Sequence, residues 1–390
     1  RGLGDVYKRQ RRVSMIGFNR SVVLEKSIEY VNDAIKSHEI MGNGHYANKC
    51  CGWMEEKFQA KKVLLTPSCT AALEMCAILL DIKDEDEVIL PSYTFVSTAN
   101  AFVIRGAKCV FVDVRPDTMN IDENKIEAAI TNKTKAIVVV HYAGVSCEMD
   151  RIKEIAIKYD IPVVEDAAQG VMATYDGKFL GTFGDLGCYS FHETKNYTMG
   201  EGGALVINNE KYIERAEILQ EKGTDRSKFF RGEIDKYSWV DIGSSYLASD
   251  IGAAYLYGQL LEADKINDDR RMSYSSYYHI LKPLEEKGKI NLPVVPDRCR
   301  HNGHMFFVKA KDLEERTQFI NYMKEKDVHC VFHYVPLHSS AAGKKYGIFY
   351  GNDEYTTRES ERLVRLPMYY GLQQNEIEYI CDCIEKFYKV

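Results

Sequence analysis

One candidate catalytic residue of this 390-residue sequence is a lysine in a predicted polar loop. Lys195 follows the β-rich run Leu186–Phe191 and precedes the glycine-rich segment Gly200-Glu201-Gly202-Gly203. A lysine amine attacks a carbonyl only as the neutral base, so a catalytic lysine must be desolvated or held near positive charge. The glycines would let the backbone approach a flat ligand closely. Most lysines are simply solvated, so this motif alone leaves both interpretations open.

A pair of acids ends another β-rich run. Glu165 and Asp166 follow two valines and precede Ala167-Ala168-Gln169. Ligands of open α/β sheets bind at the carboxyl ends of the strands. An acid held there can pair with a cationic ring nitrogen. Asp166 could equally cap a following helix.

Two more segments could hold the other parts of a planar, phosphorylated ligand. Ser68-Cys69-Thr70-Ala71-Ala72 opens a predicted helix, where free N–H groups and the Thr70 hydroxyl could bind an anion, or simply form an N-cap. Phe95, after a predicted strand, could stack on a ring or belong to the core. In chain order the four features are an anion cradle, an aromatic platform, a carboxylate and a lysine. Pyridoxal phosphate requires this set of parts.

The chain resembles the sugar aminotransferases of the DegT/DnrJ/EryC1/StrS family, and the resemblance extends from Met15 to the C-terminus. The motifs that carry the likeness are Glu165–Gln169, Ser190–Asn196 and Gly200–Gly203. Further segments resemble members that form dTDP-4-amino-4,6-dideoxygalactose, namely Phe230-Arg231-Gly232, Asp235-Lys236-Tyr237, Phe332–His338 and Tyr355-Thr356-Thr357.

The resemblance implies both a fold and a reaction. The expected fold is α/β, of the pyridoxal-phosphate-dependent fold type I (aspartate-aminotransferase-like), with a large mostly parallel sheet domain and a smaller C-terminal α/β domain. The expected reaction transfers an amino group from glutamate to a nucleotide-linked 4-keto-6-deoxy sugar and releases 2-oxoglutarate. The expected role of the product is in cell-surface polysaccharide biosynthesis. The expected assembly is a homodimer with the active site at the interface.

The resemblance also implies a role for each matching residue. Lys195 corresponds to the Schiff-base lysine, Asp166 to the acid that keeps the pyridine nitrogen protonated, and Gln169 to the residue near the phenolic oxygen. The other expected cofactor contacts are Thr70, Ala71 and Ser190 for the phosphate, Phe95 for the ring, and Ser245, supplied by the partner subunit where the family usually has an asparagine.

Several residues are expected on the substrate side. His192, three residues before Lys195, could face the sugar or merely support its neighbours. The remaining candidates are Arg226, Arg231 and Lys236, which could contact a nucleotide diphosphate or form a solvated face, and His333, Tyr334 and His338. His301 and His304 lack an evident third ligand, so no metal site is expected.

Other functions stay open at this point. The chain could aminate another nucleotide keto sugar, such as a UDP-linked one. It could also be a binding or regulatory protein that kept the fold and lost activity, although the intact Lys195, Asp166 and Gln169 argue against that. Related sugar dehydratases replace the lysine with histidine, so Lys195 places the chain with the aminotransferases.

The elements that must position these residues alternate between strands and helices, which predicts a mostly parallel sheet covered on both faces. The expected strands are 63–65, 88–90, 109–114, 136–140, 162–165, 186–191 and 204–207. One long helix is expected around Tyr246–Asp268, with a domain boundary near residue 260, giving domains 15–260 and 261–390. Residues 1–14 are expected to be a non-native or disordered leader before Met15.

The composition excludes some partners. The formal net charge is -6 and no long basic run exists, so nucleic-acid binding is not expected. No apolar run approaches the roughly 20 residues that a transmembrane helix needs. The eleven cysteines lack C-x-x-C spacing, which favours reduced structural thiols in a cytoplasmic protein.

Overall fold

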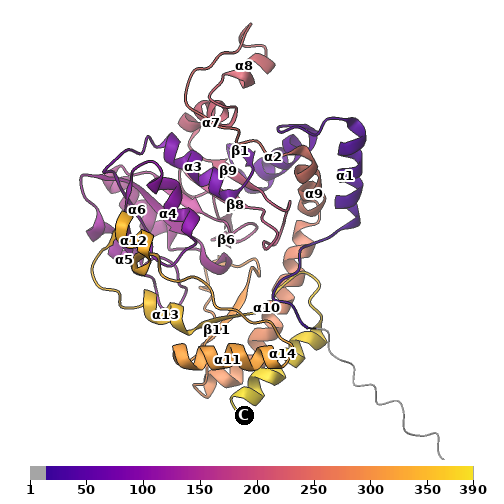
Figure 1. The fold of residues 1–390 in the computed structure, drawn as a ribbon, viewed down its shortest axis with the longest axis vertical. Helices are drawn as coiled ribbons and strands as arrows, with labels where there is room; N and C mark the ends of the chain where they lie inside the picture. Colours follow the sequence, from indigo (N-terminus) through magenta and orange to yellow (C-terminus); the bar gives the residue numbers. More distant parts are fainter. Residues whose placement is uncertain (1–14, 390) are drawn as a thin grey trace, which may run out of the picture.

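The computed structural model describes residues 15–389, and the expected leader at residues 1–14 lies outside them. An eight-stranded sheet forms the centre of the larger part of the molecule, in the order β1-β9-β8-β5-β4-β2-β3-β12 (Figure 1). Only β9 runs antiparallel to its neighbours, β1 and β8. The predicted large, mostly parallel sheet is therefore confirmed.

Seven of the eight sheet strands form where the short apolar runs predicted them, and the eighth, β12, was not predicted. Their bounds are β1 Lys62–Thr66, β2 Glu87–Pro91, β3 Lys108–Val112, β4 Thr134–Val140, β5 Val163–Asp166, β8 Leu186–Ser190, β9 Gly203–Ile207 and β12 Gly347–Phe349. Along β4, Ala136 and Val138 pack on one face while Ile137 and Val139 pack on the other. Because both faces are covered, these strands are continuously apolar rather than alternating.

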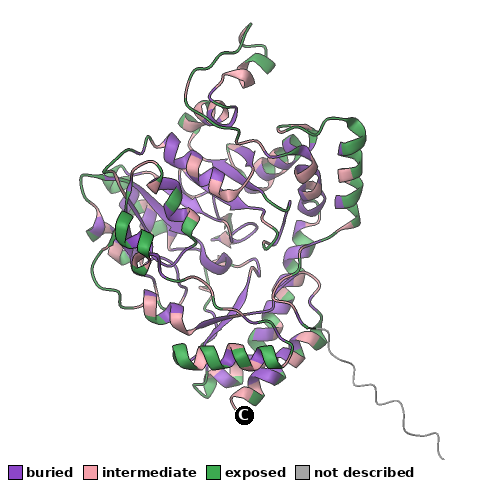
Figure 2. Ribbon diagram, viewed as in Figure 1, coloured by how far each residue is buried: buried purple, intermediate pink, exposed green. Residues whose placement is uncertain are grey.

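Helices cover the two faces of this sheet (Figure 2). One face carries α3 Cys69–Leu79, α4 Val96–Val103 and α7 Ile213–Gln220. The other face carries α2 His45–Phe58, α5 Glu123–Ile126, α6 Met149–Tyr159 and α9 Asp250–Leu260. Helix α1, Glu25–Ser37, packs on α9.

The prediction of a single long helix around Tyr246–Asp268 is wrong, because two helices occupy that region. Helix α9 ends at Leu260 and α10, Ala263–Glu286, begins after Glu262, whose backbone is not helical (φ -106°, ψ 16°). The apolar pattern continues across the break because the first turns of α10 are buried in the same core as α9, at Ala263 and Ile266. Only the later turns of α10 enter a different core. Leu256 of α9 packs on the sheet, whereas Leu281 of α10 packs in the smaller domain.

The smaller domain has its own core around a two-stranded sheet, β11 Phe306–Lys309 with β13 Leu363–Leu366. Its helices are α10, α11 Leu313–Glu325 and α14 Gln374–Phe387. Two segments cross the boundary predicted near residue 260. Ile16 joins the small core beside Val328, and β12 pairs with β3 at the edge of the large sheet.

The remaining elements are short. They are α8 Arg226–Phe230, α12 Ala341–Tyr346, α13 Thr356–Arg362, β6 Thr174–Tyr175, β7 Lys178–Phe179, β10 Cys299–Arg300, and 3-10 turns at Glu127–Ala129, Tyr142–Gly144, Glu210–Tyr212 and Leu337–Ser339. Helix α8 lies on an arm that projects from the large domain (Figure 1). Within residues 15–389, no helix is both long and apolar enough to cross a membrane.

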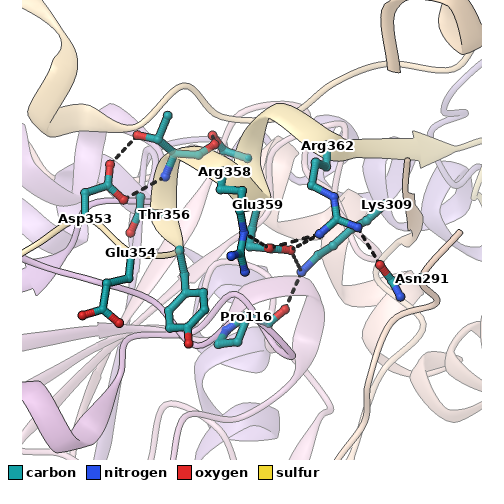
Figure 3. A network of polar contacts seen from close by, with 12 residues as sticks. Pro116, Asn291, Lys309, Asp353, Glu354, Thr356, Arg358, Glu359 and Arg362 are labelled. Atoms are coloured by element: carbon teal, nitrogen blue, oxygen red, sulfur yellow. Dashed lines mark hydrogen bonds and ion pairs between the residues drawn. The ribbon is translucent and has the colours of Figure 1, made fainter. Parts of the chain in front are cut away.

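A buried ionic network joins the two domains (Figure 3). Lys309 of β11 donates to Glu359 of α13 at 3.0 Å and to the carbonyl of Pro116 in the large domain. Both charged side chains are at most 4% exposed. Nearby, buried Asp113 after β3 accepts from the backbone N–H and the hydroxyl of Thr356. These contacts fix the small domain against the edge of the sheet that carries the site.

Candidate active site

A cavity of about 590 Å³ lies at the carboxyl ends of the central strands, between the two domains. Strands β5 and β8 end at this cavity with Asp166 and Ser190, and α3 begins beside it. Nine of the residues predicted from the sequence line it: Thr70, Phe95, Asp166, Gln169, Ser190, His192, Lys195, His333 and Tyr334. The fold thus gathers in one place side chains that are spread over 265 positions of the chain, from 70 to 334.

Lys195 lies in the loop after β8 with its amine held in a poorly solvated environment. Burial lowers the pKa of the amine below its ordinary value, and the charge of Arg365 acts in the same direction. Cys69 and Asp166 oppose this shift without cancelling it. A depressed pKa increases the neutral fraction of the amine, which is the form that attacks a carbonyl.

Asp166 is a buried acid at the end of β5. Its carboxylate accepts from the Thr98 hydroxyl at 2.6 Å and from the Ala168 N–H at 3.2 Å. The chain continues from Asp166 into turns and not into a helix, so the helix-cap interpretation is excluded. Burial raises the pKa of this carboxyl despite both hydrogen bonds. Its ionised form is therefore stabilised by any cation placed beside it.

The neighbouring acid, Glu165, faces away from the cavity, because successive strand residues point to opposite faces of a sheet. It accepts the backbone N–H groups of Gly181, Phe183 and Gly184 at 2.6 to 2.7 Å. It also contacts His141 Nε2 at 2.8 Å. Glu165 is thus a structural acid, and only Asp166 is available to a ligand.

The N-terminus of α3 and the end of β8 form the polar end of the cavity. Ser68 caps the helix by accepting from the Ala71 N–H at 3.0 Å, and Ala71 does not line the cavity. The Thr70 hydroxyl contacts Ser97 at 2.8 Å, and Ser190 lines the same cavity. Hydroxyls grouped at a helix N-terminus favour an anion such as a phosphate.

Aromatic and amide groups line the same cavity as Asp166. Phe95 is 55% exposed and lines the cavity, so it is not a core residue and is free to stack on a ligand ring. Gln169 donates to the Tyr334 hydroxyl at 3.0 Å and accepts from the Ala143 N–H at 2.6 Å. These two bonds hold the amide in one orientation. His333 stacks on Tyr334 with ring centroids 3.6 Å apart.

Besides Ala71, five predicted residues lie outside this cavity lining: Ser245, Arg226, Arg231, Lys236 and His338. Ser245 and Lys236 are exposed on the segment between α7 and α9. The Arg226 guanidinium lies 4.9 Å from the Phe230 ring centre, and Arg231 pairs with two glutamates. His338 contacts Ser92 at 2.7 Å and so supports the Leu337–Ser339 turn.

Sequence reasoning missed several groups of the site. Arg365 lines the cavity from β13, and Thr98 orients Asp166, yet no local motif marks either residue. His304, considered only as half of a metal pair with His301, lines the cavity and contacts Asn196 at 3.0 Å. The described residues contain no cluster of three or more His, Cys, Asp or Glu side chains that could hold a metal ion.

The residues present fit pyridoxal phosphate. Asp166 has no cationic side chain within ion-pair distance among residues 15–389, so a protonated ring nitrogen would supply the charge that its buried carboxylate lacks. Thr70 and Ser190 would hold the phosphate, Phe95 would cover the ring, and Gln169 would reach its edge. Lys195 would provide the amine that joins the aldehyde.

Comparison with known proteins supports the same assignment. The sequence profile of the DegT/DnrJ/EryC1/StrS aminotransferase family matches residues 23–385. The chain belongs to this family. The resemblance inferred from the motifs is therefore confirmed, and the protein is an aminotransferase.

Individual relatives match over nearly the whole chain. GDP-perosamine synthase of Escherichia coli O157:H7 is 31% identical over 93% of this chain and 96% of its own length. The spore coat polysaccharide biosynthesis protein SpsC of Bacillus subtilis is 30% identical over 85% of this chain and 86% of its own. Among solved structures, the aminotransferase TlmJ of Streptoalloteichus hindustanus superposes with a TM-score of 0.88 at 27% identity, covering 96% of this chain and 99% of its own.

A further solved structure bears on the cofactor. The PLP-form of Spr1654 from Streptococcus pneumoniae, described as a putative sugar aminotransferase, superposes with a TM-score of 0.87 at 25% identity. The two chains are covered to 96% and 98%. Together with the TlmJ structure, this match confirms the predicted fold type.

Proposed function

We propose that this protein is a pyridoxal-phosphate-dependent aminotransferase that aminates a nucleotide-linked keto sugar with glutamate as the donor. The observation that carries the proposal is the shared cavity of Lys195 and Asp166, with the hydroxyls of Thr70 and Ser190 at one end. When bound, the cofactor supplies an electron sink for the carbon that loses its proton. The protein supplies the groups that hold the sink and move the proton.

Each group of the chain has a distinct task in this proposal. Lys195 Nζ takes a proton from the donor carbon and returns it on the cofactor side, which is general acid–base work by an amine already in place. Asp166 keeps the ring nitrogen protonated and therefore electron-withdrawing. Thr98 holds the Asp166 carboxylate in position through its 2.6 Å hydrogen bond. The stacked His333 and Tyr334 and the nearby His192 form the wall that meets the sugar.

We further propose dTDP-4-keto-6-deoxyglucose as the preferred acceptor, which would give dTDP-4-amino-4,6-dideoxygalactose. The segments Phe230–Gly232, Asp235–Tyr237 and Phe332–His338 support this choice by their resemblance to enzymes of that reaction. A GDP-linked acceptor is the second candidate, because one relative is a GDP-perosamine synthase.

A homodimer would complete the site. The segment between α7 and α9, which carries Arg226, Arg231, Lys236 and Ser245, includes the arm that projects from the large domain at α8 (Figure 1). None of these four residues lines the cavity of its own chain. Large apolar side chains on the arm are solvent-exposed, including Trp239 at 79% and Phe230 at 67%. In a dimer, the arm of the partner would bring a hydroxyl and three cations towards the phosphate and nucleotide ends of the cavity.

Product analysis tests the proposal. The holoenzyme is incubated with glutamate and each of the dTDP-, UDP- and GDP-linked 4-keto-6-deoxy sugars, and the products are identified by mass and by NMR. We expect the amino sugar to form fastest from the dTDP-linked acceptor. Faster turnover of another nucleotide would transfer the assignment to that acceptor, and no amino sugar with any of the three would refute the proposed function.

A further inference from the structure

His304 is a histidine of the cavity that the proposed reaction has not used. It lies between β10 and β11 and lines the same cavity as Lys195. Its Nδ1 lies 3.0 Å from Oδ1 of Asn196. The other ring nitrogen, Nε2, has no hydrogen-bond partner within residues 15–389 and is open to the cavity.

The hydrogen bonds of Asn196 determine which ring nitrogen of His304 carries the proton. Asn196 donates from Nδ2 to the carbonyl of Asn302 at 2.9 Å, and a carbonyl can only accept. The atom that Asn196 turns towards His304 is therefore its oxygen, which must receive a proton from Nδ1. Nδ1 is thus protonated, and Nε2 of the neutral ring is an acceptor with a free lone pair.

The network behind the ring is buried and fully bonded. Asn302 donates to the carbonyls of Gln169 and Val171 at 2.8 Å and accepts from the His304 backbone N–H at 3.0 Å. Asn302 and Asn196 are both buried, so neither amide can exchange these bonds for bonds to water. The ring of His304 is therefore held in one orientation and one tautomer before any substrate binds.

The ring of His304 also stays uncharged. Burial lowers its pKa well below the ordinary value, and the charges of Lys195, Arg270 and Arg365 act in the same direction. An imidazole that remains neutral at physiological pH keeps Nε2 available as an acceptor.

His192, which lines the same cavity, presents the opposite polarity. Its Nδ1 accepts from the Thr194 backbone N–H at 3.2 Å, and a backbone N–H can only donate. The proton of the neutral His192 ring therefore lies on Nε2, which is a donor. The cavity thus offers one fixed imidazole donor and one fixed imidazole acceptor, an arrangement that suits hydroxyl groups, since these both donate and accept.

The charges around His304 select the group that it binds. Nε2 requires a donor, which in this reaction is either the ammonium of the amino acid or a hydroxyl of the keto sugar. The cations that lower the pKa of His304 would repel an ammonium, whereas a hydroxyl brings no charge. Since one of these cations is Lys195, the hydroxyl lies near the reacting carbon. In a 4-keto-6-deoxy sugar, the hydroxyl beside the keto carbon is the 3-hydroxyl.

We propose that His304 accepts a hydrogen bond from the 3-hydroxyl of the keto sugar and thereby makes the enzyme selective for acceptors that carry this hydroxyl. This inference rests on the proposed function, since it names a sugar contact of that same site. A sugar without the hydroxyl would leave the Nε2 lone pair unpaired and cut off from water, which costs more than the loss of an exposed contact.

The test compares His304→Asn with His301→Asn in the holoenzyme. The amide of His304→Asn lies close to the position of Nδ1 and can still donate to Asn196, but no atom replaces Nε2. His301 is a matched control, because its Nδ1 also makes one hydrogen bond, from the Gly303 N–H at 3.1 Å, and its ring packs on Tyr274. It does not line the cavity.

Two measurements separate the sugar from the amino donor. Calorimetry measures the binding of dTDP-6-deoxyglucose, which has no keto group to react, and of its 3-deoxy counterpart. The half-reaction with glutamate is followed by the loss of the visible cofactor absorbance, without any sugar present. Retained absorbance before glutamate is added shows that a variant is folded.

We expect the unaltered enzyme to bind the 3-hydroxy sugar about 10-fold more tightly than the 3-deoxy sugar, equivalent to about 1.4 kcal/mol. His304→Asn should bind both sugars equally, with the Kd that the unaltered enzyme has for the 3-deoxy sugar. His304→Gln should recover part of the preference, because its amide oxygen can accept near the position of Nε2. His301→Asn should keep the full preference. In all three variants the half-saturating glutamate concentration should change less than about threefold.

Three results would overturn the inference: an unaltered enzyme that binds neither sugar or binds both equally, a His304→Asn enzyme that keeps the full preference, or a loss in His304→Asn that falls on the glutamate half-reaction. The last result would place Nε2 against an amine instead of the sugar. The comparison of the two sugars on the unaltered enzyme needs no variant, so it does not depend on how well His304→Asn folds. Failure of the proposed function is separate, since it would show as a holoenzyme that forms no amino sugar, while the binding preference still reports on His304.

Discussion

Replacing Asp166 with asparagine should separate the electronic role of this acid from its structural role. The side chain keeps its shape, and its amide oxygen can still accept from the Thr98 hydroxyl, which lies 2.6 Å from the carboxylate. What disappears is the negative charge that would face the ring nitrogen. The site is buried, so solvent cannot replace that charge.

The size of the effect follows from the burial of the pair. A charged hydrogen bond in a protein interior contributes about 1.5–3 kcal/mol, and the reacting carbon depends on it most in the transition state. We therefore expect kcat to fall at least about 100-fold, or about 2.7 kcal/mol at 1.36 kcal/mol per factor of ten. The assay measures kcat with saturating glutamate and sugar, together with cofactor content from absorbance.

Glu165→Gln is the matched control, since it makes the same chemical change one residue earlier. The Glu165 carboxylate accepts three backbone N–H groups, and a glutamine leaves some of them facing its own NH₂. The free energy of unfolding should fall by about 3 kcal/mol, at about 1–3 kcal/mol for each donor left unsatisfied. Activity per folded molecule should stay nearly constant. An Asp166→Asn enzyme that holds its cofactor and turns over normally would refute the assigned role.

Three further variants test other parts of the structure. Lys195→Ala should abolish the visible cofactor absorbance of the purified protein, and a retained band would show that another amine is used. Glu359→Ala should lower the free energy of unfolding, measured by denaturant titration, by about 3–5 kcal/mol, because it leaves the buried Lys309 without its ion-pair partner. The double variant Glu359→Ala/Lys309→Met should recover part of that loss. The pKa of His304 is lower in the folded protein than in the unfolded chain. As the pH falls below about 6.5, the unfolded chain therefore binds a proton that the folded protein does not, and the free energy of unfolding falls. His304→Gln should flatten that loss by up to about 1.4 kcal/mol per pH unit, and an unchanged slope would contradict the burial argument.

The sequence alone determined the features that depend on neighbours along the chain. The sheet strands of the large domain that were expected all form, because short apolar runs bounded by polar turns need no distant partner to be recognised. Asp166 follows from the same reasoning, since a residue that ends a parallel strand must lie at the ligand edge of the sheet, whereas Ser190 was expected from the family resemblance. The family motifs around Lys195 are equally local.

Only the tertiary structure decided what depends on where separate segments meet. The break between α9 and α10 leaves no mark in the apolar pattern, because the first turns of α10 are buried in the same core as α9 before the helix continues into the core of the smaller domain. Arg365 carries no local signal either, and it reaches Lys195, 170 positions earlier, only because β13 packs beside the cavity. The surroundings of a charged group are set by the segments that pack around it, so the sequence could supply that arginine but not show that it lines the cavity.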